Sequence, residues 1–206
     1  MIRKHALSIT VFALLFSGPL AAQDTAVQGS TAPAMTPEMQ AMMQAYQKAG
    51  TPGAEHQKLA ATAGTYDLTV KAWHAPNTPP TTDTGTATRK MILGDRVMVE
   101  EVTSQMMGQP YNGQGLHGFD NTTGKYWSTW NDSMSTGVMI SEGSCDADMA
   151  CTFTGTYNDP VSKKPQTTRM TTRWTDKNTE VFEMHGPGPD GKETKMMEIT
   201  YKKRAR

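Results

Sequence analysis

The residues with the greatest chemical capacity lie together in one stretch, GLHGFDNTTGKYWSTWND, at residues 115–132. The stretch combines an imidazole, carboxylates and large aromatic rings: His117, Asp120, Asp132, Tyr126, Trp127 and Trp130. Asp120 could in principle orient the imidazole of His117. On a strand, however, residues three apart point to opposite faces, so we do not expect a direct bond. Asp120 fits a turn better, where its carboxylate accepts backbone N–H bonds ahead of Gly124.

Common catalytic signatures are absent from the sequence. The chain has no G-x-S-x-G, no H-E-x-x-H and no phosphate-binding loop. After the first helix-like apolar run, histidine occurs at His56, His74, His117 and His185, and no two of these lie within one helical turn. Ser128 has no histidine close to it in the sequence. We therefore predict no catalytic residue.

The second half of the 115–132 stretch has the composition of a ligand-pocket wall. If a turn precedes it, residues 125–132 form a strand with Tyr126, Ser128, Trp130 and Asp132 on one face. Rings supply affinity for an apolar ligand, and a few polar groups orient it. The alternative is that the rings fill the core and the carboxylate caps a turn.

The predicted ligand contacts are Trp73, Arg96, Tyr126, Trp130 and Asp132. Arg96 would bind an anionic head group or, alternatively, form a salt bridge with Asp132 or Asp120.

Methionine is abundant, with 16 residues in the chain, and thioethers are ligands that Cu(I) prefers. Four of them are clustered: Met35, Met39, Met42 and Met43. Together with Tyr46, this spacing is also what an amphipathic helix needs to dock on a barrel, and we favour docking over copper. His185 could bind haem, but a rim histidine that faces water explains it better. We therefore predict no metal site and no cofactor.

Two cysteines, Cys145 and Cys151, flank turn-forming residues in SCDADMAC. An even count in an exported chain predicts a disulfide, because the turn would let two adjacent strands bring the sulfurs together. The alternative, a metal or redox pair, lacks a neighbouring histidine and C-x-x-C spacing.

Two short helices precede the strands that must position these residues. In TPEMQAMMQAYQKAG, Thr36 suits an N-cap, Pro37 the first helical position and Gly50 the end. GAEHQKLAATAG predicts a second helix with His56 and Leu59 on one side. We assign residues 36–63 to these helices.

From residue 64 onward, Gly, Asn, Asp and Pro punctuate β-prone sequence at intervals of roughly 8–14 residues, which predicts consecutive antiparallel strands. The predicted strands are 65–74, 82–92, 96–106, 111–119, 125–132, 136–144, 151–158, 166–175, 179–186 and 193–203. The joints are short and no helical crossover is available. We therefore predict a mainly β fold, an antiparallel up-and-down β-barrel of about 8–10 strands over residues 64–206. A β-sandwich is the alternative.

The N-terminus, MIRKHALSITVFALLFSGPLAAQ, has the three-part layout of a secretory signal peptide. We predict cleavage after Ala22, a flexible leader at residues 23–35, and a periplasmic or secreted protein. Removing Arg3 and Lys4 from 20 basic and 20 acidic residues leaves 18 against 20, a charge of −2. Neither a basic face for nucleic acid nor a further membrane-spanning segment is expected.

Several fragments together resemble a known bacterial family. EHQKLAATAGTY at 55–66, LGDR at 93–96, the 115–132 stretch and the closing MMEITYKKR resemble domain of unknown function 1579 over roughly residues 55–204. Tyr66 stands where tryptophan is usual, and Asp95 where a second glycine is usual. The resemblance implies a calycin-like barrel, similar to lipocalins and fatty-acid-binding proteins, and implies no activity.

These observations predict non-covalent binding of a small apolar or amphipathic ligand inside the barrel. The alternative is a structural or interaction protein with a filled barrel, which acts through its outer surface or its Met-rich helix. Haem binding, copper binding and hydrolysis form the third group of alternatives.

Overall fold

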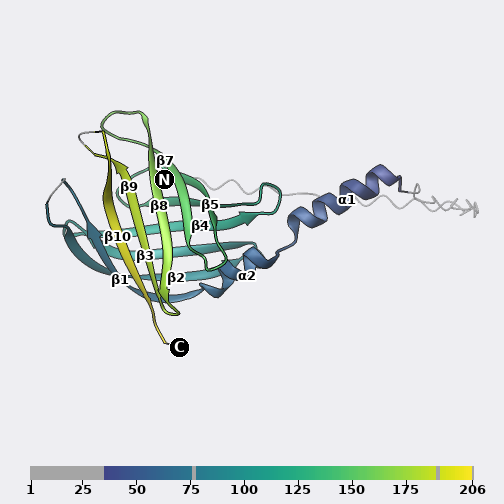
Figure 1. Cartoon of the computed structure of the whole chain (residues 1–206), viewed down its shortest axis with the longest axis horizontal. Coiled ribbons are helices and arrows are strands. Elements are labelled where there is room, and N and C mark those ends of the chain that lie inside the picture. Colours follow the sequence, from purple (N-terminus) through teal and green to yellow (C-terminus); the bar gives the residue numbers. More distant parts are fainter. Residues whose placement is uncertain (1–34, 76–77, 189–190, 206) are drawn as a thin grey trace, which may run out of the picture. The chain divides into compact units, whose positions relative to one another are not determined.

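The computed structural model describes residues 35–75, 78–188 and 191–205 (Figure 1). The predicted signal peptide and all but the last residue of the predicted leader lie outside the described residues. Within the described ranges, no helix is long and apolar enough to cross a membrane.

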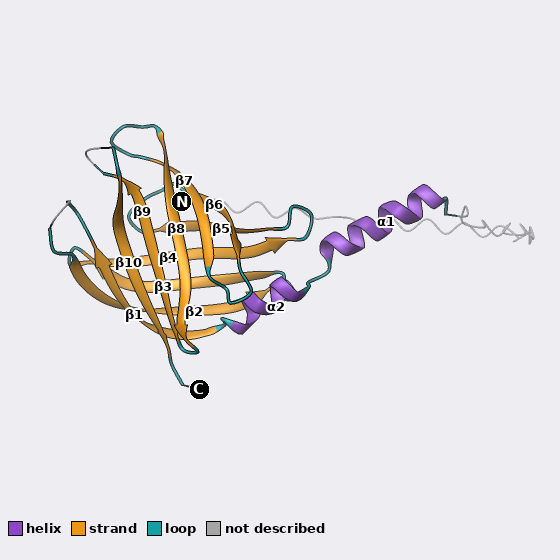
Figure 2. Ribbon diagram, in the orientation of Figure 1, coloured by secondary structure: helices purple, strands orange, loops and turns teal. Residues whose placement is uncertain are grey.

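Two helices and ten strands follow one another along the described chain (Figure 2). The helices are α1 (Pro37–Gly50) and α2 (Ala54–Ala61). The strands are β1 (Gly64–Ala72), β2 (Thr81–Ile92), β3 (Val97–Met106), β4 (Gln109–Asp120), β5 (Lys125–Asp132), β6 (Met139–Cys145), β7 (Cys151–Asn158), β8 (Pro165–Asp176), β9 (Thr179–Pro187) and β10 (Glu193–Lys203). Each strand matches a predicted strand to within a few residues, because turn residues that interrupt alternation are local signals.

The strands close into a barrel in the order β1-β10-β9-β8-β7-β6-β5-β4-β3-β2. Closure comes from β1, which pairs antiparallel with both β2 and β10. In the β1–β10 register Tyr66 lies opposite Lys203, and Ala72 lies opposite Met197. The predicted up-and-down barrel is confirmed and the sandwich alternative is wrong, because a sandwich would leave edge strands at the point where this sheet closes.

Side chains of β1 alternate between the inside and the outside of the barrel. Tyr66 and Leu68 are buried, while Asp67 and Thr69 between and after them are exposed. The two buried side chains join residues of β2, β3 and β10 in one core cluster: Tyr66, Leu68, Ala87, Val102 and Tyr201.

Helix α2 caps one end of the barrel. Its Leu59 is buried against Met98 of β3 and Tyr126 of β5. The hydroxyl of Thr62, which follows the helix, donates to the sulfur of Met98 over 3.3 Å. The hydroxyl of Tyr66 donates to the Thr62 carbonyl, which ties the start of β1 to the same cap.

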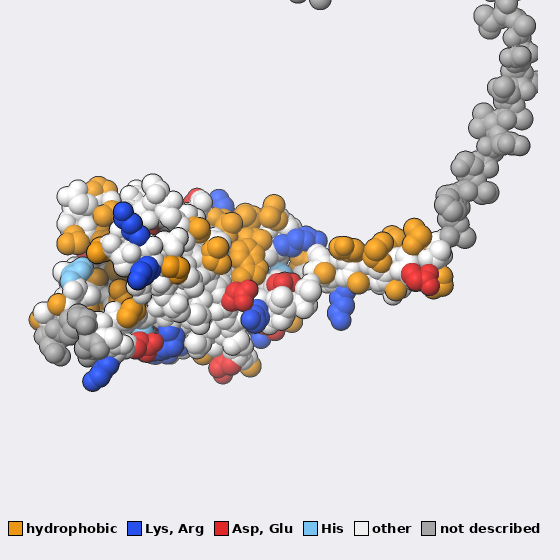
Figure 3. Space-filling view, turned by 90° about the horizontal axis from the view of Figure 1, so that it is seen from above, with side chains coloured by type: hydrophobic (Ala, Val, Ile, Leu, Met, Phe, Trp, Pro, Cys, Tyr) orange, Lys and Arg blue, Asp and Glu red, His pale blue; other side chains and the backbone are white. Residues whose placement is uncertain are grey.

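Helix α1 differs from the prediction, because none of its residues is buried. Four of its apolar side chains are strongly exposed: Met39 at 49%, Met42 at 54%, Met43 at 55% and Tyr46 at 75%. Hydrophobic side chains gather along this helix in the space-filling view (Figure 3). The prediction that this face docks on the barrel is therefore wrong. Helical periodicity identifies an apolar stripe but does not identify what covers it.

Cys145 and Cys151 form the predicted disulfide, with Cα atoms 4.0 Å apart. The two residues lie opposite each other at the ends of β6 and β7. Closing so short a loop contributes about 2 kcal/mol to the free energy of unfolding in the chain-entropy model. The bond holds this hairpin at the end of the barrel that α2 caps, where Cys145 packs against the cluster of Leu59, Met98 and Tyr126.

Candidate functional site

The aromatic stretch of the sequence occupies β4 and β5. As the alternation predicts, Tyr126, Ser128, Trp130 and Asp132 share the inner face of β5, and Trp127 lies on the outer face. The inner face of β5 thus carries rings, a hydroxyl and a carboxylate into the barrel.

Two glycines of β4 make room for the ring of Trp130. A Cβ on Gly113 would lie 2.2 Å from Cζ2 of Trp130, and a Cβ on Gly115 would lie 2.9 Å from its Cε3. Since neither atom exists, the indole lies flat against the backbone of β4. A larger residue at either position would displace the ring.

The indole of Trp130 belongs to a small hydrogen-bonded group that we call the Trp130 cluster: Tyr111, Trp130 and Asp132. The indole Nε1 donates to the Tyr111 hydroxyl over 3.0 Å, and this hydroxyl donates to Oδ2 of Asp132 over 3.4 Å. Burial, followed by the charge of Asp132, raises the pKa of Tyr111, so its hydroxyl keeps the proton that it donates.

A buried ion network crosses the interior. Arg89 of β2 donates to Glu100 of β3 over 3.0 Å and to Glu180 of β9 over 2.5 Å, and all three side chains are at most 8% exposed. The guanidinium also lies 4.9 Å from the ring centre of Tyr66 and 4.5 Å from that of Tyr201. Burial alone would raise the pKa of Glu100, but the guanidinium and a neighbouring histidine lower it to about 2. One cation is therefore shared by two carboxylates.

Sequence reasoning missed this network. Glu100 is 11 residues from Arg89, and the register of the predicted hairpin of strands 82–92 and 96–106 could have paired them. Glu180 is 91 residues from Arg89, so only the closure of the barrel brings it to the guanidinium.

Polar groups continue from the ion network across β4, β5 and β6. His117 Nε2 lies 3.2 Å from Oε2 of Glu100, and the histidine side chain keeps 26% of its surface exposed. Ser128, its register partner on β5, shares a hydrogen bond of 2.6 Å with Ser141. Asp120 instead accepts a backbone N–H bond of 2.7 Å within the β4–β5 turn, as predicted. The histidine is thus oriented by a glutamate and is accessible to a polar ligand group.

Apolar side chains line much of the remaining interior. Val70, Trp174, Phe182 and Ile199 pack against the core cluster from β1, β8, β9 and β10, yet each retains accessible surface. Inward side chains of a closed barrel that stay accessible must border on space that solvent can enter. The interior therefore combines accessible apolar surface with a few fixed polar groups, which is the composition of small-molecule sites.

Three of the five predicted ligand contacts lie outside the Trp130 cluster. Tyr126 is buried and donates its hydroxyl to Glu55 of α2, so it belongs to the capped end. Trp73 follows β1, and its ring centre lies 5.6 Å from the ammonium of Lys195. Arg96 lies in the β2–β3 turn and donates to the last carbonyl of α1 over 2.9 Å.

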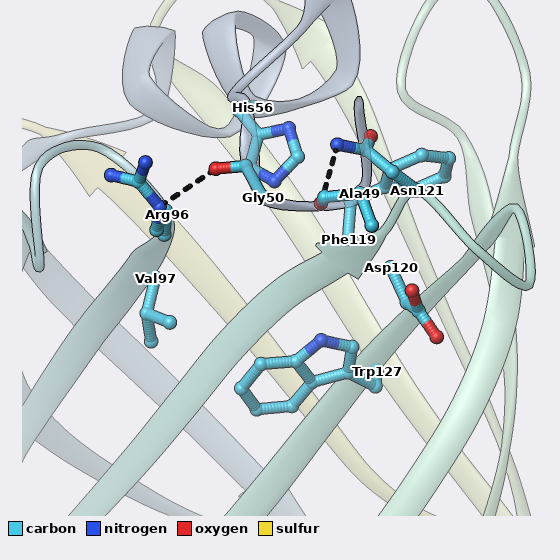
Figure 4. A pocket seen from close by; sticks show the side chains of 9 residues that line it. All are labelled: Ala49, Gly50, His56, Arg96, Val97, Phe119, Asp120, Asn121 and Trp127. Atoms are coloured by element: carbon cyan, nitrogen blue, oxygen red, sulfur yellow. Dashed lines mark hydrogen bonds between the residues drawn. The ribbon is translucent and has the colours of Figure 1, made fainter. Parts of the chain in front are cut away.

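A hollow of about 240 Å³ lies at the joint between α1 and α2 (Figure 4). Arg96 and Asn121 extend from two turns to the backbone around Gly50, which ends α1. His56 Nδ1 accepts the N–H of Gly53 over 3.1 Å. Because the polar groups around this hollow hold the chain between the helices, we assign it to the joint and not to a ligand.

The position of His185 decides whether it could bind a haem inside the barrel. His185 of β9 lies in register with Arg169 and Lys195, on the outer face. Its Nδ1 is buried without a hydrogen-bond partner, and its Nε2 lies 3.9 Å from Glu183. A haem inside the barrel would therefore not reach this histidine. In the part of the chain that the structure describes, no group of three or more His, Cys, Asp or Glu side chains could hold a metal ion.

A second hollow, of about 550 Å³, is a trough over β3, β4 and β5. Outward polar side chains such as Gln114 and Asn131 form its walls. It offers no apolar ring to a ligand, so the barrel interior is the stronger candidate site.

Comparison with known proteins supports the fold but assigns no activity. A family model described as "Protein of unknown function (DUF1579)" matches residues 51–203. Among solved structures, the chain is similar to "Crystal Structure of Rv2717c from M. tuberculosis", with a TM-score of 0.58 and 11% identity over 75% of this chain and 100% of that chain. At this identity the likeness shows the fold alone. No curated protein matches the chain.

Proposed function

Since the chain belongs to the family described as Protein of unknown function (DUF1579), we propose its function from the barrel itself. The protein binds a small apolar or amphipathic ligand non-covalently inside the barrel. It does so after export to the periplasm or the medium.

The observation that carries this proposal is the accessible apolar surface inside a closed barrel. Trp130, Trp174 and Phe182 are large side chains that face inward and are not fully buried. A barrel filled by its own side chains would bury such residues. Widening a barrel from eight to ten strands also enlarges its interior, and larger barrels enclose ligand cavities.

Export is supported by the sequence of the N-terminus and by the disulfide between Cys145 and Cys151. Disulfides persist in oxidising compartments and are rare in the cytosol. Fractionation of cells that express the full chain tests this part: the shorter, processed form should appear outside the cytoplasm.

Ligand binding is tested on the mature chain with Nile red, a neutral dye that fluoresces in apolar sites. Native mass spectrometry and solvent extraction of the purified protein would first identify any molecule that copurifies. Titration should then give saturable dye fluorescence that an added amphiphile reverses.

A matched pair of variants locates the site. Trp130→Leu removes an inward ring and should weaken dye binding roughly five- to tenfold, because ring contacts contribute on the order of 1 kcal/mol each. Trp127→Leu removes the same side chain from the outer face of the same strand and should leave binding unchanged. If nothing copurifies and the dye stays dark, the proposal fails.

One observation favours a second candidate, a protein that acts by binding other macromolecules. The apolar face of α1, with Met42 and Met43 more than half exposed, is unusual for a monomeric surface. An interaction role would predict that replacing these methionines abolishes complex formation in cell extracts while dye binding persists.

A further inference from the structure

The charge inside the barrel restricts the kind of ligand that it accepts. Resting on the proposed function, we infer that the barrel prefers an amphiphile with a cationic head group over one with a carboxylate. The preference follows from three features of the interior: a guanidinium that is already neutralised, an excess of inward carboxylates, and aromatic faces beside one of them.

The interior guanidinium is already neutralised and enclosed, so it attracts an anionic ligand weakly. Arg89 is enclosed by Glu100 and Glu180, and its side chain is 8% exposed. The Tyr66 and Tyr201 rings cover it further. A carboxylate that entered the barrel would meet one positive charge already balanced by two negative charges.

One other cation lies on the inner face of the described strands. Lys203, at the end of β10, donates to the carbonyl of Ala61 over 3.0 Å, so it is held at the end that α2 caps. By register, the inner face of the described strands carries four carboxylates against Arg89 and Lys203: Asp83, Glu100, Asp132 and Glu180. A buried anionic head group would thus be desolvated without a compensating partner, which is unfavourable.

The Trp130 cluster offers what a cation needs. Its carboxylate, Asp132, accepts from the Tyr111 hydroxyl and from the backbone N–H of Met134, and a carboxylate has capacity for further donors. The Trp130 and Tyr111 rings lie beside it. An ammonium over an aromatic face is attracted by the ring quadrupole, and a nearby carboxylate adds to this attraction.

The test compares three ligands that share one ten-carbon chain: decyltrimethylammonium, decanol and decanoate. Each competes with Nile red for the mature protein at neutral pH, below the concentration at which micelles form. We expect the ammonium compound to bind at least tenfold more tightly than decanoate, with decanol between them.

Two isosteric variants locate the selectivity. Asp132→Asn should reduce the ratio of ammonium to decanoate affinity at least threefold and leave decanol affinity unchanged. Asp148→Asn removes the same charge from an exposed turn at the other end of the barrel and should leave the ratio unchanged.

The outcomes separate this inference from the proposal on which it rests. If none of the three ligands displaces the dye, and the dye itself does not bind, the binding function fails. If all three ligands bind but decanoate binds as tightly as the ammonium compound or more tightly, the binding function stands and the charge inference is overturned. A preference that Asp132→Asn leaves intact overturns the assignment of the head group to the Trp130 cluster.

Discussion

Arg89 is the residue on which the interior of the barrel most depends. It connects β2 to β3 and β9 through Glu100 and Glu180, and all three side chains are nearly inaccessible. Replacing a whole buried ion network with apolar residues is often neutral, but removing one partner leaves the others charged and unpaired.

We therefore expect Arg89→Met to lower the free energy of unfolding by about 3–5 kcal/mol. Urea titration followed by far-UV circular dichroism measures the change. Arg173→Met is the matched control, because Arg173 is exposed on β8, and its effect should stay within about 0.5 kcal/mol. Equal effects of the two substitutions would show that the network is not formed in solution.

The same network predicts how stability depends on pH. In the folded protein the pKa of Glu100 falls from its usual 4.5 to about 2. A carboxylate whose pKa is lowered by folding stabilises the fold when the pH is above its pKa in the unfolded chain. This contribution disappears as the pH falls from about 4.5 to about 2. A shift of this size corresponds to roughly 3 kcal/mol at neutral pH.

The comparison with Glu100→Gln isolates that contribution. The difference in free energy of unfolding between the two proteins should be largest above pH 5 and should shrink as the pH approaches 2. Urea titrations at a series of pH values provide the measurement. A difference that stays constant with pH would mean that Glu100 is not held ionised by Arg89.

At the scale of elements, the two helices have opposite relations to the barrel. Leu59 of α2 is 6% exposed and packs against β3 and β5, whereas Met43 of α1 is 55% exposed. We expect Leu59→Ala to cost about 2–5 kcal/mol of unfolding free energy, because it leaves a cavity in the cap. Met43→Ala should change it by less than about 0.5 kcal/mol.

Thermal unfolding of both variants tests this contrast. A cost for Met43→Ala that approaches that of Leu59→Ala would show that α1 is packed in solution. The predicted docking of its methionine face would then be right after all.

The elements that the sequence predicts well are those with local signals. Strand positions follow from the alternation of apolar and polar residues and from the turn residues between strands. The same alternation predicts that Trp130 and Asp132 lie on one face of their strand. The Cys145–Cys151 disulfide could also be predicted from the sequence, because the six-residue separation of the two cysteines suits a hairpin.

The rest of the site depends on contacts that no local pattern contains. Trp73 and Arg96 are near strand ends, where alternation stops and the turn backbone decides which way a side chain points. Arg96 bonds to the carbonyl of Gly50, 46 residues away, because α1 ends beside its turn. Glu180 reaches Arg89 only because β1 and β10 close the sheet.

For the whole molecule, closure is the property on which an interior binding site depends. In an open antiparallel sheet, every second amide of each edge strand has no partner and exchanges rapidly with solvent. In the closed barrel, β1 pairs on one side with β2 and on the other with β10, so both sets of amides are bonded.

Amide hydrogen exchange followed by NMR distinguishes these arrangements at single residues. We expect consecutive amides from Leu68 to Lys71 to exchange slowly, with protection close to that of other barrel strands such as β3 and β8. The exposed turn at Lys177 serves as the fast-exchanging reference within the same sample. A pattern of alternating fast and slow amides along β1 and β10 would mean that the ladder between them opens. Solvent would then enter through the wall, Arg89 would lose its partner on β9, and an enclosed site for an amphiphile could not persist.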